Sequence, residues 1–183
     1  MKTIILTGPM GAGKSTVAKA LAKRIKIPNV PLDNVRWYYY FKNGYSLEHE
    51  LSLPDFHEIQ KYWKPFEVTA VQAALREFPN SIMDFGAGHS YYPEPEHLDE
   101  VKSFLLPYPN IFLLLPSQDP EISLRICSRR IEERRKLPVT QDVVDSNRIF
   151  ISHPSNYILA KHIVYTDGKT PESVAEEIEA LLV

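Results

Sequence analysis

A glycine-rich stretch near the amino terminus, residues 8–16, limits the possible folds of this chain more than any other feature. It reads Gly-Pro-Met-Gly-Ala-Gly-Lys-Ser-Thr and matches the pattern G-x-x-x-x-G-K-[ST]. Glycines at this spacing let the backbone curl so that successive N–H groups point to one spot, at the positive end of the following helix. Such a cup accommodates a polyphosphate. The stretch therefore predicts a phosphate-binding loop, and the alternative is a glycine-rich turn without a ligand.

The residues on either side of the loop support this interpretation. Residues 3–7 form an apolar run that predicts a buried strand, and apolar residues recur at helical spacing after the loop. The helix is expected over about residues 14–26. It should end before Pro28, because the residue that precedes a proline disfavours helical geometry. Lys14 is expected to reach the β- and γ-phosphates and Ser15 to hold Mg²⁺. The predicted nucleotide-binding residues are Gly8, Gly11, Ala12, Gly13, Lys14, Ser15 and Thr16.

Size and charge restrict the class of protein. The 183 residues are 44% hydrophobic and 24% charged, which suffices for one α/β domain with its own core. A net charge of −2 provides no global basic field, so we expect no nucleic-acid partner. No apolar run approaches the ~18 residues of a membrane span, and the single cysteine, Cys127, excludes an internal disulfide. We expect a cytoplasmic protein without a membrane partner, and its oligomeric state stays open.

Strand and helix patterns alternate along the rest of the chain. Strands are expected near residues 30–32, 81–85, 111–115 and 162–165, and helices near 66–78, 98–105, after Asp119, after Thr140 and after Thr170. This alternation is typical of an α/β fold with a parallel sheet. Residues 36–66 show no dominant strand or long-helix pattern, and residues 153–157 are expected to form a loop. We predict one domain over residues 1–183.

Two aspartates lie at the carboxyl ends of predicted strands. Because carboxylates at the carboxyl ends of parallel strands face the ligand crevice, Asp33 is a site candidate, and its alternative role is a helix N-cap. Asp84 stands where a phosphate-loop protein needs an acid to hold the metal's water shell or to take a proton, and its alternative role is to cap a loop. Gly86 and Gly88 follow, and they either permit close approach of a substrate or serve turn geometry alone.

Aromatic residues concentrate in residues 36–66. They are compatible with a substrate pocket, with a helical flap, with core packing or with a subunit contact, and we favour a substrate-covering lobe near residues 34–80. Arg36, at its edge, is a candidate for substrate binding.

An arginine-rich helix is expected after Asp119. Its arginines predict a lid near residues 125–140 that closes over a nucleotide, whereas Glu132 and Glu133 are compatible with a solvated, salt-bridged helix. Residues 136–138 would break this helix at the edge of the lid. The arginines concerned are Arg125, Arg129, Arg130, Arg134 and Arg135.

The order of these features resembles the small-molecule P-loop kinases, especially the shikimate kinase-like and gluconate kinase-like group. The resemblance covers nearly the whole chain and is strongest over residues 3–26. It implies a three-layer α/β/α fold with a five-stranded parallel sheet in the order 2-3-1-4-5, with ATP on the loop beneath an arginine lid. By the same resemblance Asp33 would contact a substrate hydroxyl, residues 86–88 would cradle the substrate, and Arg129 or Arg130 would meet the phosphates.

Three residues depart from the shikimate kinase pattern. Asn34 follows a single Asp33 where those enzymes usually show two spaced aspartates, Ala87 occupies the middle of the glycine turn, and Asp84 ends the third strand.

We therefore predict a kinase that uses Mg²⁺ and transfers the γ-phosphoryl group of ATP to a hydroxyl of a small molecule. Two alternatives remain: a nucleoside monophosphate kinase in which Arg36 and Arg76 grip the acceptor phosphate, and an ATP-binding regulator that contacts a protein through residues 36–66. The predicted catalytic residues are Lys14, Asp33, Asp84, Arg129 and Arg130. The predicted metal ligands are Ser15 and Asp84, and the predicted substrate-binding residues are Asp33, Arg36, Gly86 and Gly88.

Overall fold

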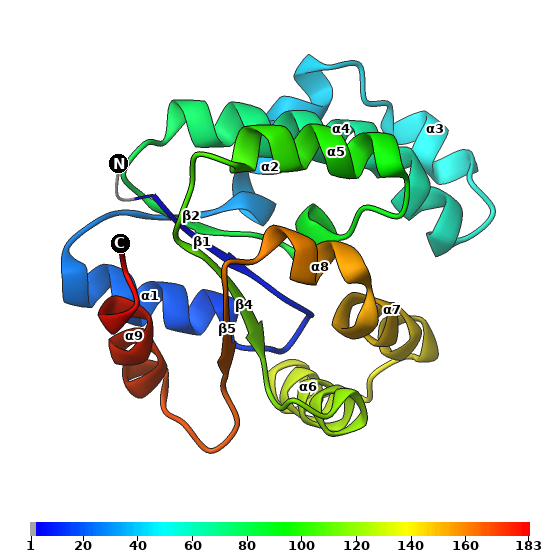
Figure 1. Cartoon of the computed structure of the whole chain (residues 1–183). Helices are drawn as coiled ribbons and strands as arrows, with labels where there is room; N and C mark the ends of the chain where they lie inside the picture. Colours follow the sequence, from blue (N-terminus) through cyan, green and yellow to red (C-terminus); the bar gives the residue numbers. More distant parts are fainter. Residues whose placement is uncertain (1–2) are drawn as a thin grey trace.

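The computed structural model describes residues 3–183 and contains one five-stranded sheet (Figure 1). All the strands pair in parallel, in the order β2-β3-β1-β4-β5, which confirms the predicted architecture. Every residue of β1, β3 and β4 is buried, as expected for a parallel sheet that is covered on both faces. The strands are β1 (Ile4–Thr7), β2 (Asn29–Pro31), β3 (Ile82–Asp84), β4 (Ile111–Leu115) and β5 (His162–Tyr165).

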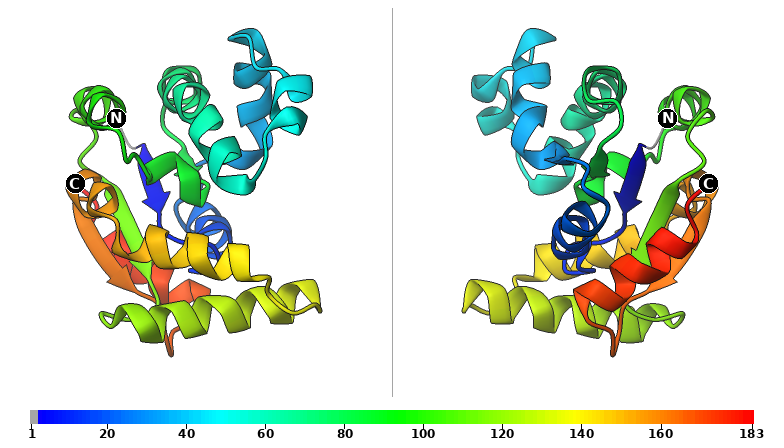
Figure 2. Two further views of the ribbon diagram at one scale, coloured as in Figure 1. Left: turned by 90° about the vertical axis from the view of Figure 1, so that its right-hand side faces the viewer. Right: turned by 90° about the vertical axis from the view of Figure 1, so that its left-hand side faces the viewer.

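The alternation of side chains along β1 divides the interior into two cores. Ile4 and Leu6 point to the face covered by α1 (Lys14–Ile25) and α9 (Pro171–Ala180), which pack against each other. Ile5 points to the opposite face, which is covered by α2 (Leu32–Lys42), α4 (Phe56–Glu77) and α5 (Pro95–Leu105). The lobe of α2, α3 (Leu47–Ser52) and the start of α4 stands at one end of the molecule, far from α6 (Pro120–Arg135) (Figure 2).

The structure corrects the expected position of Asp33 at the end of a strand. The second strand ends at Pro31, and the helix begins at Leu32, so Asp33 lies in the first helical turn rather than at a strand end. Pro31 occupies the N-cap position, so Asp33 is not the cap either. A carboxylate in the first turn complements the positive end of the helix, which explains why Asp33 is compatible with this position.

The expectation that no long helix is present in residues 36–66 is wrong, because α4, 22 residues long, begins at Phe56 and the helices α2 and α3 cover most of the rest. Ser46 caps α3 by accepting a hydrogen bond from the His49 N–H, and Asp55 caps α4 by accepting one from the Glu58 N–H. Helix α4 begins ten residues before the predicted start and contains Pro65. Ring contacts between α4 and the preceding segment support this geometry. They join Tyr45 to Tyr62 (centroids 5.7 Å apart), Tyr40 to Phe66 (5.7 Å) and Trp37 to Trp63 (6.0 Å).

Residues 153–157 are also not a loop. His153 caps the short helix α8 (Pro154–Leu159) by accepting a hydrogen bond from the Ser155 N–H, and Pro154 occupies the first helical position. Helices α6 and α9 begin directly after Asp119 and Thr170, as expected, and these two side chains cap them. Helix α7 (Gln141–Ser152) follows Thr140 as expected. Within residues 3–183, no helix has both the length and the apolar character needed to cross a membrane.

Candidate active site

The phosphate-binding loop joins β1 to α1 and requires glycine at two positions. Gly8 and Gly11 have φ angles of +132° and +83°, in a region that side chains disfavour. A Cβ atom on Gly8 would lie 2.3 Å from the Leu114 carbonyl oxygen, and one on Gly11 would lie 2.6 Å from the Cys127 carbonyl oxygen. The loop therefore packs directly against the backbone of β4 and α6, and this packing fixes its curl.

Lys14 and Asp84 meet beside this loop. The register that places Leu6 opposite Asp84 brings the end of β3 next to the start of the loop. Lys14 Nζ donates hydrogen bonds to the carbonyl oxygens of Gly8 (2.8 Å) and Pro9 (2.9 Å). Burial lowers the pKa of Lys14, against the opposing charges of Asp84 and Asp33. Burial raises the pKa of Asp84, and a hydrogen bond from Ser15 and the charge of Lys14 oppose this rise.

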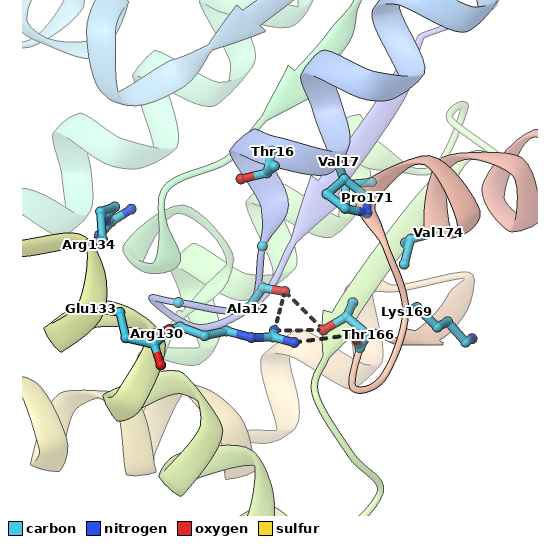
Figure 3. A pocket seen from close by; sticks show the side chains of 12 residues that line it. Ala12, Thr16, Val17, Arg130, Glu133, Arg134, Thr166, Lys169, Pro171 and Val174 are labelled. Atoms are coloured by element: carbon cyan, nitrogen blue, oxygen red, sulfur yellow. Dashed lines mark hydrogen bonds between the residues drawn. The ribbon is translucent and has the colours of Figure 1, made fainter.

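A cavity of about 540 Å³ opens on one side of the loop (Figure 3). Arg130 is fixed in its wall, because its guanidinium donates to Thr166 Oγ1 (3.0 Å), the Thr166 carbonyl (3.2 Å) and the Ala12 carbonyl (3.4 Å). Pro171 lies across the opening from this arginine in Figure 3. The cavity has a volume typical of small-molecule sites. Its lining residues are Gly11, Ala12, Gly13, Thr16, Val17, Arg130, Glu133, Arg134, Thr166, Lys169, Pro171 and Val174.

A smaller cavity of about 140 Å³ lies next to it. The two cavities share Gly11, Gly13, Thr16 and Arg134, so the loop and one arginine form the boundary between them. The smaller cavity brings together most of the polar residues that the sequence selected. It is lined by Met10, Gly11, Gly13, Lys14, Ser15, Thr16, Asp33, Asp84, Phe85, Gly86, Ala87 and Arg134.

Asp33 faces a recess formed by Arg36, Gly86 and His89. Its Oδ1 atom lies 3.8 Å from Arg36 Nη1 and 3.9 Å from His89 Nδ1. The Arg36 guanidinium lies over the rings of Trp37 (4.5 Å) and Trp63 (4.9 Å), an arrangement that stabilises a partly buried cation. Arg36 therefore presents a fixed positive charge beside a carboxylate whose side chain is 60% exposed.

His89 is the most isolated polar side chain in this recess. It is 1% exposed, and neither ring nitrogen has a hydrogen-bond partner among residues 3–183. Burial, together with the positive charges of Arg36, Lys64 and Lys14, lowers the pKa of His89 well below its usual range, so its ring is neutral near pH 7.

Comparison with known proteins places the chain in a family. The AAA_18 family model, described as an AAA domain, matches residues 4–149. This chain belongs to that AAA domain family. Its relatives include shikimate kinases from Enterococcus faecalis, 28% identical over 97% of this chain and 96% of the relative, and from Francisella tularensis subsp. holarctica, 26% identical over 100% and 95%.

Solved structures show the same fold. A shikimate kinase from Acinetobacter baumannii in complex with shikimate superimposes with a TM-score of 0.66 at 19% identity, covering 99% of this chain and 92% of that one. A gluconokinase from Sinorhizobium meliloti gives 0.56 at 13% identity, covering 98% and 90%. These findings confirm the predicted group: this AAA-domain chain is a small-molecule P-loop kinase of the shikimate and gluconate kinase group, an ATP-dependent class of enzyme.

The arginines of α6 differ in whether they line the two cavities. Arg130 lines the larger cavity and Arg134 lines both cavities. Arg129 is 63% exposed at its side chain, lies 3.8 Å from Glu133, and is not among the described residues that line either cavity. Sequence analysis did not favour Arg134. The spacing of these arginines could have indicated it, because residues 130 and 134 are four positions apart and so share one face of a helix.

Sequence analysis also missed a buried ion pair behind the recess. Lys64 and Glu67 are each 2% exposed and are directly paired, and Lys64 also donates to the Gly88 carbonyl (3.0 Å). A Cβ atom on Gly88 would lie 2.4 Å from Glu67 Oε1. Gly88 therefore contacts the ion pair and is not among the described residues that line the smaller cavity. The i, i+3 spacing of the pair was hidden because the helix was expected to begin only near residue 66, after Lys64.

Replacing Gly86 with alanine is expected to lower kcat/KM for the acceptor by about 10²-fold. The added Cβ would lie 2.2 Å from Asp33 Oδ1 and 2.8 Å from His89 Nδ1, and the exposed Asp33 side chain is the group that can move. The φ angle of −60° at Gly86 allows alanine, so the fold should persist. Steady-state kinetics measure the effect, and unchanged ADP binding serves as the control. An unchanged kcat/KM would contradict this arrangement of Asp33.

Proposed function

We propose that this protein transfers the γ-phosphoryl group of Mg²⁺-bound ATP to a hydroxyl of a small molecule that carries an anionic group. The main support is the pair of cavities that meet at the phosphate-binding loop, with Arg134 at their boundary and Lys14 in the wall of the smaller one. One cavity has room for a nucleoside, and the other contains two carboxylates, Asp33 and Asp84.

The nucleotide is assigned to the larger cavity. Its base would lie between Arg130 and Pro171, and its phosphates would cross the loop amides toward the smaller cavity. Lys14 would exchange the carbonyl oxygens of Gly8 and Pro9 for phosphate oxygens, which are stronger acceptors because they are charged. Arg134 would reach the transferring group, because it borders both cavities.

The residues near the loop are compatible with Mg²⁺. This ion prefers oxygen ligands and is usually held by one or two carboxylates together with substrate phosphates. The Ser15 hydroxyl and the Asp84 carboxylate supply such oxygens next to the loop. Among residues 3–183, no cluster of three or more His, Cys, Asp or Glu side chains is placed to hold a metal ion. The bound ion would neutralise charge on the β- and γ-phosphates.

The acceptor is assigned to the smaller cavity. Asp33 would orient the acceptor hydroxyl and take its proton, because its carboxylate is exposed to this cavity. Arg36 would bind an anionic group of the acceptor. The Nε atom of Arg36 is buried and has no hydrogen-bond partner within the described part of the chain. The contact between Arg36 Nη1 and Asp33 Oδ1, at 3.8 Å, is too long for a hydrogen bond. Shikimate, named in the similar kinases, combines hydroxyl groups with a carboxylate and is the first compound to test.

A coupled ADP-release assay tests this function. We expect Mg²⁺-dependent ATP turnover that is stimulated by a member of a panel containing shikimate, gluconate, other hydroxylated carboxylates and nucleoside monophosphates. The Asp33→Asn variant should lose about 10²–10⁴-fold in acceptor-stimulated turnover and bind ADP normally, because general acid–base catalysis contributes factors of this size. The exposed Asp99→Asn is the matched control. Wild-type turnover in Asp33→Asn would overturn the assigned role of Asp33.

A further inference from the structure

A single asparagine from α7 holds the tip of the phosphate-binding loop. The side chain of Asn147 accepts a hydrogen bond from the Met10 N–H at its Oδ1 atom (2.9 Å) and donates one from its Nδ2 atom to the Met10 carbonyl (2.9 Å). Asn147 is 0% exposed, and 137 residues separate it from Met10. Both backbone groups of one loop residue are thus satisfied by one buried side chain.

This clamp determines the direction of a neighbouring amide. The Met10 carbonyl and the Gly11 N–H belong to one planar trans peptide group, so they point in opposite directions. Because Asn147 holds the carbonyl, the Gly11 N–H points away from α7. Gly11 has a φ angle of +83° and lines both cavities, so this amide belongs to the part of the loop where phosphates are expected.

The clamp is needed because the tip of the loop is conformationally permissive. Gly8 and Gly11 flank Met10 closely, and glycine lets adjacent peptide groups rotate at low energetic cost. On the other side of the tip, the Ala12 carbonyl is already fixed by Arg130 and Thr166. Asn147 provides the corresponding support at Met10.

Helix α7 is itself anchored, so it can act as a rigid support. At its carboxyl end the ring of Phe150 packs against Tyr91 (centroids 5.4 Å apart). The Phe150 carbonyl accepts a hydrogen bond from Asn156 Nδ2 (2.7 Å), and Ser155 Oγ donates to the Ser90 carbonyl (2.9 Å). These contacts join α7 and α8 to η1 (Ala87–Ser90) and to Tyr91 directly after it, on the acceptor side of the site.

We propose that Asn147 is a positioning residue that pre-orients the Gly11 amide for a nucleotide phosphate. The inference rests on the proposed function, since it requires the nucleotide phosphates to lie on this loop. It predicts that Asn147 contributes to the binding of phosphates and not to the binding of the nucleoside, whose assigned cavity lies between Arg130 and Pro171.

Binding measurements on the Asn147→Leu variant test the proposal. Leucine has a similar size but forms neither hydrogen bond. We expect the Kd for Mg²⁺-ADP, measured by calorimetry, to rise about tenfold, in keeping with the loss of two buried hydrogen bonds. The Kd for adenosine, measured by ligand-observed NMR, should stay unchanged. If leucine prevents folding, the smaller Asn147→Ser variant removes the same two-point contact. The Kd values for Mg²⁺-ADP and for adenosine then test the proposal in the same way.

The matched control is Asn110→Leu. Asn110 is also 0% exposed, and its side chain likewise bonds both backbone groups of one residue, the Val183 N–H (3.0 Å) and the Val183 carbonyl (3.3 Å). This contact lies outside the support of the loop, so the variant should leave the ratio of the two Kd values unchanged. Equal weakening of ADP and adenosine by Asn147→Leu, or an unchanged Kd for ADP, would overturn the positioning role alone. Absence of Mg²⁺-ADP binding by the wild-type protein would overturn the proposed function together with this inference.

Discussion

Replacing Lys14 with methionine is expected to lower phosphoryl transfer by about 10²–10³-fold, the loss typical of one preorganised charge contact at a transition state. Lys14 places a buried ammonium in the wall of the smaller cavity, where charge would develop during the proposed transfer. Methionine fills a similar volume without the charge. Because burial already disfavours the charged form of Lys14, the variant should melt at or above the wild-type temperature.

Comparison of kcat with the thermal midpoint separates chemistry from folding for this variant. Lys19→Met is the matched control, since Lys19 is exposed on the same helix, and it should retain wild-type kcat. Wild-type turnover in Lys14→Met would show that the loop lysine takes no part in transfer, and the assigned mechanism would fail.

Replacing Glu67 with leucine is expected to lower the free energy of unfolding by about 3–5 kcal/mol, because it leaves Lys64 buried without its partner. Both side chains are 2% exposed, so solvent cannot compensate for the lost carboxylate. The rings of Tyr91 and Tyr92 lie 4.9 Å and 5.5 Å from the ammonium and offer much weaker stabilisation than a carboxylate. Urea unfolding monitored by circular dichroism measures the change.

The double variant Lys64→Met/Glu67→Leu completes this experiment. Removing both charges eliminates the uncompensated ion, so the double variant should recover most of the stability that Glu67→Leu loses. A loss below about 1 kcal/mol for Glu67→Leu would indicate that water or a rearrangement satisfies Lys64, and the pair would then not be a buried structural element.

The residues whose positions sequence analysis predicted correctly are those marked by local sequence patterns. Lys14 and Ser15 belong to one contiguous motif, and Asp84 follows a strand that had to lie in the sheet, so local patterns sufficed to bring all three to one edge. The order of the strands came from the resemblance to known kinases. The roles assigned to these residues stay predictions until the variants are measured.

The residues that sequence analysis missed depend on contacts between distant segments. The choice between Arg129 and Arg134 requires the rotation of α6 relative to the sheet, which the sequence of the helix does not specify. Asn147 contacts a residue 137 positions earlier, so no local pattern marks it. In residues 36–66 the aromatic side chains are dispersed around the helices and obscure the amphipathic period, and Pro65 suggested a break that tertiary packing overrides.

The hydrogen bonds of Lys14 to its own loop have a consequence for the release of product. The ammonium has two oxygen partners in the loop itself, the Gly8 and Pro9 carbonyls. In the proposed mechanism, departure of ADP would leave no unsolvated cation behind, because the side chain would return to those carbonyls. The loop would thus act as an internal competitor of the nucleotide, which would limit affinity and favour rapid turnover over tight retention.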